Sequence, residues 1–397
     1  MIQIAKVTII AVLLPALVFE TAITYASEET ASPAQFSTPL PAESIPSVAS
    51  LPTEYPDTWV FAHDMSFGSL LDGKVLIVDV AAETRNFKGM IGAGMMGQFQ
   101  PSRTSSELYT GQTMLSRRTY GERTDLVIIF DKSSLLPIDE IALPPKRQQI
   151  VTQPNSFQLT DNGEIGLVMN FTPAASVSVV NLKNRQFLQE IPLPGCNLLY
   201  PTGQRGFSSF CADGSMVSFA LNADGTVKGT SRSDRFIDIQ ADPLYAKSAV
   251  LDGITYFLSY QGRIQPIDMR KPTPNILADW SFVPKELKVD SWLPSGWQVL
   301  SARNGELYVL MDINGKEGSH KTGGSEVWVL DIASKKLDRR IALPAGGVSL
   351  TVTRSDPAYL VVTNGGTELN VFDSASGKHL RDIHLGMSAT PFVLYSN

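Results

Sequence analysis

A short β-hairpin motif recurs along this chain, and the repeat constrains the fold more than any other feature of the sequence. Its clearest copy lies in residues 325–344, where an apolar strand (327–330) precedes a polar turn (334–336) and a returning strand (337–343). One such hairpin cannot bury its own faces in water. The motif therefore predicts that neighbouring copies pack against one another.

Seven segments match the strand that precedes the turn: 75–80, 126–131, 177–182, 216–221, 263–268, 327–332 and 369–374. Most have another β-rich run before them and a returning run after them, and a short run lies between units, so each unit offers four strands. Residues 58–397 divide into seven units of about 49 residues, and such four-stranded repeats are typical of a β-propeller. We therefore predict an all-β fold, a seven-bladed β-propeller with four-stranded antiparallel blades, over stacked sandwich domains, which would need linkers.

The last apolar run, at 390–397, follows the seventh hairpin, where the first strand of a new blade would stand. The first unit begins at Trp59 without such a strand. We expect the C-terminal run to lie beside the first unit and to close the ring, which leaves only short, protected edges.

The first 57 residues differ from this pattern. Residues 1–26 have a basic residue, an apolar run and small residues near Ala26, and they predict a cleaved export signal rather than a membrane anchor. Residues 27–57 are rich in Pro, Ser, Ala and Glu and predict an extended arm. The net charge of -6 argues against a nucleic-acid partner. We therefore expect an exported protein that has no membrane segment after cleavage.

The chain has two cysteines, Cys196 and Cys211. An even count in an exported protein favours a disulfide, and two free buried thiols are the alternative. Two cysteines cannot build the usual cysteine-rich zinc site. His63, His320, His379 and His384 show no compact metal-ligand spacing either, so no protein-built metal site is predicted.

Residues 92–97 read G-x-G-x-x-G, which resembles a dinucleotide-binding turn. Such a site requires a helix directly after the glycines, and no amphipathic helix begins here. The segment instead predicts a crossing between two blades in which glycines allow close backbone approach.

Two further clusters have alternative interpretations. Residues 117–125 contain Arg117 and Arg118 near Glu122 and Asp125; they predict either charge-assisted hydrogen bonds that fix a loop or a solvated charge run. Tryptophans in 280–297 suit either a protein interface or a propeller core. No catalytic set of residues is predicted in the chain.

Several dispersed segments resemble the heavy subunit of quinoprotein amine dehydrogenases, the family of the aralkylamine and methylamine dehydrogenases. They are residues 89–91, 116–117, 121–125, 171–180, 292–298 and 315–321, together with both cysteines. Residues 143–147 and 316–321 look more like the aralkylamine enzymes. The resemblance covers nearly all of the chain after the arm.

This resemblance implies a seven-bladed propeller and a periplasmic enzyme that deaminates primary amines, aralkylamines in preference to methylamine, to an aldehyde and ammonia. It implies a heavy2-light2 heterotetramer whose light subunit carries tryptophan tryptophylquinone, with electrons passing to a blue copper protein of the amicyanin or azurin kind. The chain described here would be a non-catalytic subunit without a cofactor of its own. The alternative is a periplasmic propeller that acts as a binding or assembly module.

The resemblance also assigns a substrate-channel site. Met95 falls where family members have a phenylalanine at the mouth of the channel, and Met96, Gly97 and Phe99 lie around it. Because methionine is flexible where phenylalanine forms a rigid wall, we expect the substitution to affect substrate preference.

Overall fold

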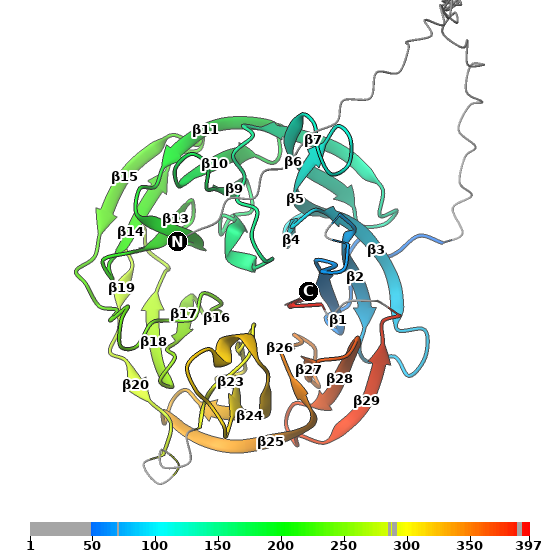
Figure 1. Cartoon of the computed structure of the whole chain (residues 1–397), viewed down its shortest axis with the longest axis vertical. Helices are drawn as coiled ribbons and strands as arrows, with labels where there is room; N and C mark the ends of the chain where they lie inside the picture. The colour runs from blue at the N-terminus through cyan, green and yellow to red at the C-terminus, as the bar shows by residue number, and fades with distance from the viewer. Residues whose placement is uncertain (1–48, 70, 285–286, 288–291, 387–390) are drawn as a thin grey trace, which may run out of the picture. The chain divides into compact units, whose positions relative to one another are not determined.

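The computed structural model describes residues 49–69, 71–284, 287, 292–386 and 391–397. In this part of the chain, seven antiparallel sheets stand around a central axis as the blades of a β-propeller (Figure 1). The predicted fold class is confirmed. The predicted export signal and the arm as far as residue 48 lie outside the described residues.

Each blade takes its strands in chain order from the axis outwards, except that the first begins with the C-terminal strand. The strands of blades 1 to 4 are β30 (Val393–Ser396), β1 (Trp59–Asp64), β2 (Gly73–Asp79) and β3 (Phe87–Gly94); β4 (Gln98–Pro101), β5 (Glu107–Leu115), β6 (Arg123–Asp131) and β7 (Pro137–Leu143); β8 (Phe157–Leu159), β9 (Ile165–Asn170), β10 (Ser176–Asn181) and β11 (Gln186–Pro192); and β12 (Cys196–Pro201), β13 (Gly206–Cys211), β14 (Met216–Leu221) and β15 (Val227–Arg232).

The strands of blades 5 to 7 are β16 (Ala249–Leu251), β17 (Ile254–Leu258), β18 (Arg263–Asp268), β19 (Asn275–Ile276) and β20 (Trp280–Ser281); β21 (Leu293–Pro294), β22 (Leu300–Arg303), β23 (Glu306–Asp312), β24 (Gly324–Asp331) and β25 (Lys336–Gly347); and β26 (Ser349–Val352), β27 (Tyr359–Thr363), β28 (Glu368–Asp373) and β29 (His379–His384). Two 3-10 turns, η1 (Pro154–Ser156) and η3 (Ser319–Lys321), lie in the connections.

The ring closes as predicted. Strand β30 pairs antiparallel with β1, in a register that places Val60 opposite Ser396 and His63 opposite Val393. The first and last parts of the propeller therefore share one blade, and the innermost edge of that sheet comes from the chain terminus.

The core lies between blades, and the alternation along the middle strands builds it. In β6, Leu126, Ile128 and Phe130 pack in one cluster with blade 1, whereas Val127 and Ile129 pack in another with blade 3. Because each blade is covered on both faces, its middle strands are apolar in nearly every position. This two-sided burial explains the continuous apolar runs in the repeat.

The propeller has two faces. On the crossing face, the chain passes from one blade to the next, and the loops between second and third strands also lie there. On the turn face lie the turns from the innermost to the second strand and from the third to the fourth strand of each blade.

An aspartate ends several third strands on the turn face. The side chain of Asp131 accepts hydrogen bonds from the backbone N–H groups of Ser133 and Ser134, and Asp331 and Asp373 cap their turns in the same way. The recurring aspartate therefore has a turn-forming role.

The two cysteines form a disulfide. Cys196 on β12 and Cys211 on β13 lie directly opposite each other, and their sulfur atoms are 2.01 Å apart. Both residues belong to the apolar cluster between blades 3 and 4. The predicted pairing is confirmed.

Candidate functional site

The segment with the G-x-G-x-x-G pattern forms the crossing from blade 1 to blade 2. Strand β3 ends at Gly94, Met95 and Met96 form a turn, and β4 begins at Gln98. Gly97 must be a glycine because a Cβ atom there would lie 1.6 Å from the carbonyl oxygen of Ala93. The segment is thus an inter-blade crossing, as predicted, and no helix follows it.

The structure separates the residues that the resemblance assigned to the channel mouth. Met95 and Met96 are partly exposed on the crossing face, and Met96 has a φ of 46°. Phe99, in contrast, is 1% exposed and packs against Phe61 and Tyr395, with ring centroids 5.1 Å and 5.2 Å away. The Met95–Met96 turn is therefore the part of this set that faces solvent, and Phe99 supports it from the core.

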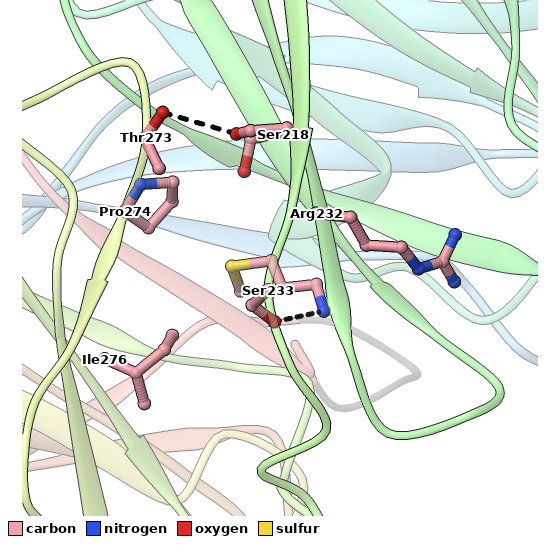
Figure 2. Close-up of a pocket in the computed structure, with 8 residues that line it drawn as sticks. Ser218, Arg232, Ser233, Thr273, Pro274 and Ile276 are labelled. Carbon is pink, nitrogen blue, oxygen red and sulfur yellow. Dashed lines mark hydrogen bonds between the residues drawn. The ribbon is translucent and has the colours of Figure 1, made fainter.

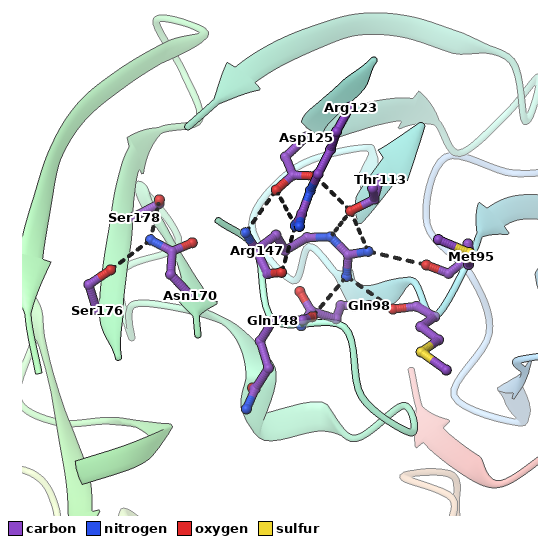
Figure 3. A network of polar contacts seen from close by, with 11 residues as sticks. Met95, Gln98, Thr113, Arg123, Asp125, Arg147, Gln148, Asn170, Ser176 and Ser178 are labelled. Carbon is purple, nitrogen blue, oxygen red and sulfur yellow. Dashed lines mark hydrogen bonds and ion pairs between the residues drawn. The ribbon is translucent and has the colours of Figure 1, made fainter. Parts of the chain in front are cut away.

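A buried arginine holds this turn in place (Figure 3). Arg147, from the crossing between blades 2 and 3, donates from Nη2 to the carbonyl oxygen of Met95 at 3.1 Å and from Nη1 to that of Met96 at 3.0 Å. Its Nε and Nη2 also donate to Thr113 Oγ1, at 3.0 Å and 2.9 Å. The residue is 2% exposed, and burial lowers the pKa of Arg147 to about 10, so it stays charged at neutral pH. The rigid, planar guanidinium group of Arg147 thus fixes two consecutive backbone carbonyl groups.

Asp125 joins this arginine to the polar cluster at 117–125. Its carboxylate accepts two hydrogen bonds from the Arg123 guanidinium, at 2.9 Å and 2.8 Å, one from Thr113 Oγ1 at 2.7 Å, and one from the backbone N–H of Arg147 at 2.8 Å. Figure 3 shows these groups around the buried carboxylate. Burial of this charged carboxylate is compensated because its oxygen atoms accept hydrogen bonds from these donors.

The charge cluster therefore fixes a loop through charge-assisted hydrogen bonds, which was one of its two predicted roles. The residues that form these bonds differ from those predicted. Arg123 and Arg147 bond to Asp125, whereas the Arg117 guanidinium lies 5.8 Å from the ring centroid of Tyr120 and Arg118 is exposed. Alternation within a strand explains the difference, because Arg123 and Asp125 lie two residues apart on one face of β6.

A second group of contacts connects blades across the axis on the same face. Trp297 Nε1 donates to the carbonyl oxygen of Thr152 at 3.2 Å, and Thr152 Oγ1 donates to that of Gly97 at 2.9 Å. The Lys247 ammonium lies 3.2 Å from the centroid of the Trp297 ring, and burial lowers the pKa of Lys247 to about 7. An indole and an amine therefore lie near the Met95–Met96 turn on the crossing face.

Of the two tryptophans in residues 292–298, one lies in the propeller core and the other on the crossing face, so each of the two predicted roles applies to one of them. Trp292 is 5% exposed and belongs to the core, where its ring centroid is 5.1 Å from that of Trp328. Trp297 lies on the crossing face. Hence only one of the two is available to a partner or a substrate.

The histidines do not gather into a site. His63 is fully buried in β1, and burial lowers its pKa to about 3, so it is neutral. His320 is partly buried beside Tyr260, with ring centroids 5.3 Å apart. His379 and His384 lie beside Asp382 and Glu368 on blade 7. Among the described residues, no three His, Cys, Asp or Glu side chains are grouped so that they could hold a metal ion.

A small pocket between blades 4 and 5 is too small to be a substrate site (Figure 2). It is lined by Ser218, Arg232, Thr273 and Ile276, among others, and has a volume of about 40 Å³. Such a volume has room for water only.

The crossing face has exposed apolar side chains. Six of the fourteen large ones among the described residues lie on it: Phe67, Met114, Tyr120, Phe171, Ile239 and Ile313. They lie at the end of a second strand, in the loop after one, or in an inter-blade crossing, and Tyr120 is 64% exposed. Such residues supply apolar area that a protein partner can bury.

Comparisons with known proteins agree with this geometry. The family model described as methylamine dehydrogenase heavy chain matches residues 66–395. The methylamine dehydrogenase heavy chain of Methylophilus methylotrophus is 27% identical over 316 residues, which cover 77% of this chain and 76% of that protein. The heavy chain of Methylobacillus flagellatus is 26% identical over 324 residues, covering 79% of this chain and 80% of that one.

Among solved structures, dihydro-heme d1 dehydrogenase NirN has a similar fold, with a TM-score of 0.51 and 14% identity. The match covers 84% of this chain and 64% of that one. At this identity the likeness concerns the fold alone.

Reasoning from sequence missed the contacts that build the site. Arg147 and Thr113 are 34 residues apart, Arg147 and Met95 are 52 apart, and Trp297 and Thr152 are 145 apart. Arg147 belongs to residues 143–147, which supported only the family resemblance. The residues next to it in the sequence give no signal that its side chain is buried. The neighbouring residues Pro145, Lys146 and Gln148 gave no indication of its role.

Proposed function

Because this chain belongs to the family of methylamine dehydrogenase heavy chains and is the heavy subunit of an amine dehydrogenase, we propose that it serves a periplasmic enzyme that oxidatively deaminates primary amines. In the net reaction the amine and one water give an aldehyde, ammonia, two protons and two electrons. The electrons pass to a blue copper protein. Aralkylamines are preferred over methylamine.

Tryptophan tryptophylquinone, carried by the light subunit, supplies the electron-accepting chemistry. The chain described here contributes the wall of the substrate channel. Its residues orient the amine and exclude water at the mouth, and they hold no proton-transfer group that the reaction requires. The assembly is a heavy2-light2 heterotetramer.

The Arg147-held Met95–Met96 turn is the observation that carries this proposal. The Arg147 guanidinium donates to the two carbonyl oxygens and so positions the backbone of the turn, while Met95 and Met96 remain partly exposed. Methionine fills irregular space and makes favourable sulfur–aromatic contacts, which suits the side chain of an aralkylamine. A fixed backbone with adaptable side chains therefore supports selection among amines by size.

The light subunit covers the crossing face. The exposed apolar residues there, Phe67, Tyr120 and Phe171 among them, supply the area that such a subunit would bury. The partner then closes over the Met95–Met96 turn, and the channel runs between the two subunits. Periplasmic location is supported by the predicted export signal; no helix of the described residues is long and apolar enough to cross a membrane.

Co-expression with a light subunit of an amine dehydrogenase tests the proposal. We expect a stable complex with a quinone absorption band, bleached by an aralkylamine faster than by methylamine, that reduces a blue copper protein. A chain that purifies alone and only binds other proteins would instead establish the binding-module alternative. An isolated chain that oxidises amines unaided would overturn the division of roles.

A further inference from the structure

The central axis of the propeller encloses a large cavity. It has a volume of about 880 Å³ and is lined by residues of all seven blades, mainly from the innermost strands and the turns that follow them. Lys247 lines its end towards the crossing face, and arginines line its end towards the turn face.

The cavity is cationic although the chain as a whole has a net charge of -6. Among its lining residues, five carry a cationic side chain and two, Asp161 and Asp252, carry a carboxylate. One of the cations, Arg270, is neutralised by Asp268 at 2.6 Å. The excess positive charge is therefore local to the axis.

Three of these cations gather on the turn face. Arg103 follows β4, Arg303 ends β22 and Arg354 follows β26, so they reach the axis from three different blades. Arg303 Nη2 donates to the carbonyl oxygen of Arg354 at 2.6 Å, which brings these two residues together. Desolvation by the surrounding protein lowers the pKa of Arg103 to about 10, and the nearby charge of Arg354 contributes to this decrease.

These three arginines are among those of the described chain that form no ion pair with a carboxylate. Eight arginines of the described chain form ion pairs with carboxylates: Arg123, Arg185, Arg205, Arg232, Arg263, Arg270, Arg339 and Arg340. No described carboxylate forms an ion pair with Arg103, Arg303 or Arg354, although Asp161 and Asp57 lie near enough to raise the pKa of Arg103 and Arg354, respectively. The buried Nε of Arg303 has no hydrogen-bond partner among the described residues.

We propose that Arg103, Arg303 and Arg354 form a binding site for a multivalent oxyanion, such as phosphate or a polycarboxylate, at the turn-face end of the cavity. Guanidinium groups match the geometry of phosphate and carboxylate oxygens, and an anion among three of them removes their mutual repulsion. The surrounding protein strengthens the attraction relative to an open surface. The site does not depend on the proposed amine oxidation.

Titration calorimetry of the whole chain at low ionic strength, with inorganic phosphate and separately with citrate, tests the proposal. We expect binding of both anions that weakens with added sodium chloride. Arg103→Gln and Arg354→Gln should each weaken binding at least about tenfold, the loss of one charged hydrogen-bonding partner. Arg235→Gln is the matched control, because Arg235 is an exposed arginine outside the cavity, and its affinity should equal that of the wild type.

Thermal unfolding provides a second measurement that separates a lost site from a damaged fold. Without anion, Arg354→Gln should be at least as stable as the wild type because it removes charge repulsion. With phosphate, the wild type should gain stability and the variant should gain much less. No heat of binding from the wild type, or equal weakening by Arg235→Gln, would overturn the proposal.

Discussion

Arg147 on the crossing face and the cluster of Arg103, Arg303 and Arg354 on the turn face have opposite environments. On the crossing face, Arg147 is buried, and its Nε and both Nη atoms donate to oxygen acceptors. On the turn face, Arg103 and Arg354 stand in a water-accessible cavity without a paired carboxylate. A guanidinium whose donors are all hydrogen-bonded fixes the local backbone conformation, whereas a cluster of guanidinium groups without paired carboxylates keeps its positive charge available to a ligand. The comparison separates a positioning role from a binding role for one residue type.

The faces also differ in how acidic side chains are used. Asp125 is 0% exposed and joins Arg123, Thr113 and Arg147. Asp331 on the turn face is partly exposed and caps its own turn. A tertiary carboxylate connects strands distant in sequence, and a local one stabilises a few residues. The faces should therefore respond differently to substitution.

The largest effect is expected from Arg147→Met. The substitution leaves the carbonyl oxygens of Met95 and Met96 and the hydroxyl of Thr113 without their partner in a buried site, which should cost about 3–5 kcal/mol of unfolding free energy. Urea unfolding measures the loss. Arg235→Met, at an exposed position, is the control and should change stability by less than about 0.5 kcal/mol. Equal losses in the two variants would remove the contrast between the faces.

Acid should weaken the core before it weakens the turn-face caps. His63 is buried and its pKa is lowered from 6.5 to about 3. The unfolded chain therefore binds more protons between these values, and stability is lost as the pH falls from about 6.5 towards about 3. His63→Leu should flatten this part of the curve in urea unfolding at stepped pH. An unaltered curve in His63→Leu would contradict the assignment.

The caps should act in a lower pH range. Hydrogen bonds from Arg270 lower the pKa of Asp268 from 3.8 to about 2. Because a lowered carboxyl pKa stabilises the fold above the unfolded value, this contribution is lost as the pH falls from about 3.8 to about 2. Asp268→Asn should reduce the slope of stability against pH in that range alone.

Substrate preference should respond to Met95→Phe in the assembled enzyme. A rigid ring on the exposed turn should change the ratio of kcat/KM for an aralkylamine over methylamine by about tenfold, the effect of one reshaped apolar contact. Met90→Phe, at an exposed methionine on β3 of the same blade, is the control. If the two variants kept the wild-type ratio, the turn would have no part in selecting the amine.

The smallest effect is expected from Asp331→Ala. It removes a side-chain oxygen that accepts from the backbone N–H of Ser334 in an exposed turn. Thermal unfolding should show a decrease in Tm within about 3 °C. Asp234→Ala, an exposed aspartate outside these turns, gives the reference value. A loss as large as that of Arg147→Met would mean that local caps matter as much as tertiary contacts.

Several features were predictable from the sequence because they are local or periodic. The apolar run at 126–130 predicted a middle strand of a blade, and that strand is β6. The run at 390–397 predicted closure because the first unit lacked an innermost strand, and β30 supplies it. The glycines at 92–97 predicted a crossing because no helix followed. Each conclusion needed only neighbours along the chain.

The sequence by itself determined the seven-bladed repeat and its closure and favoured the disulfide, because these depend on residue spacing and on the number of cysteines. Only the tertiary structure decided that Arg147 holds the Met95–Met96 turn, that Phe99 is buried, and that Arg103 and Arg354 meet at the axis. The physical reason is that the ring brings together crossings and turns from different blades. Sequence distance carries no information about which of them meet.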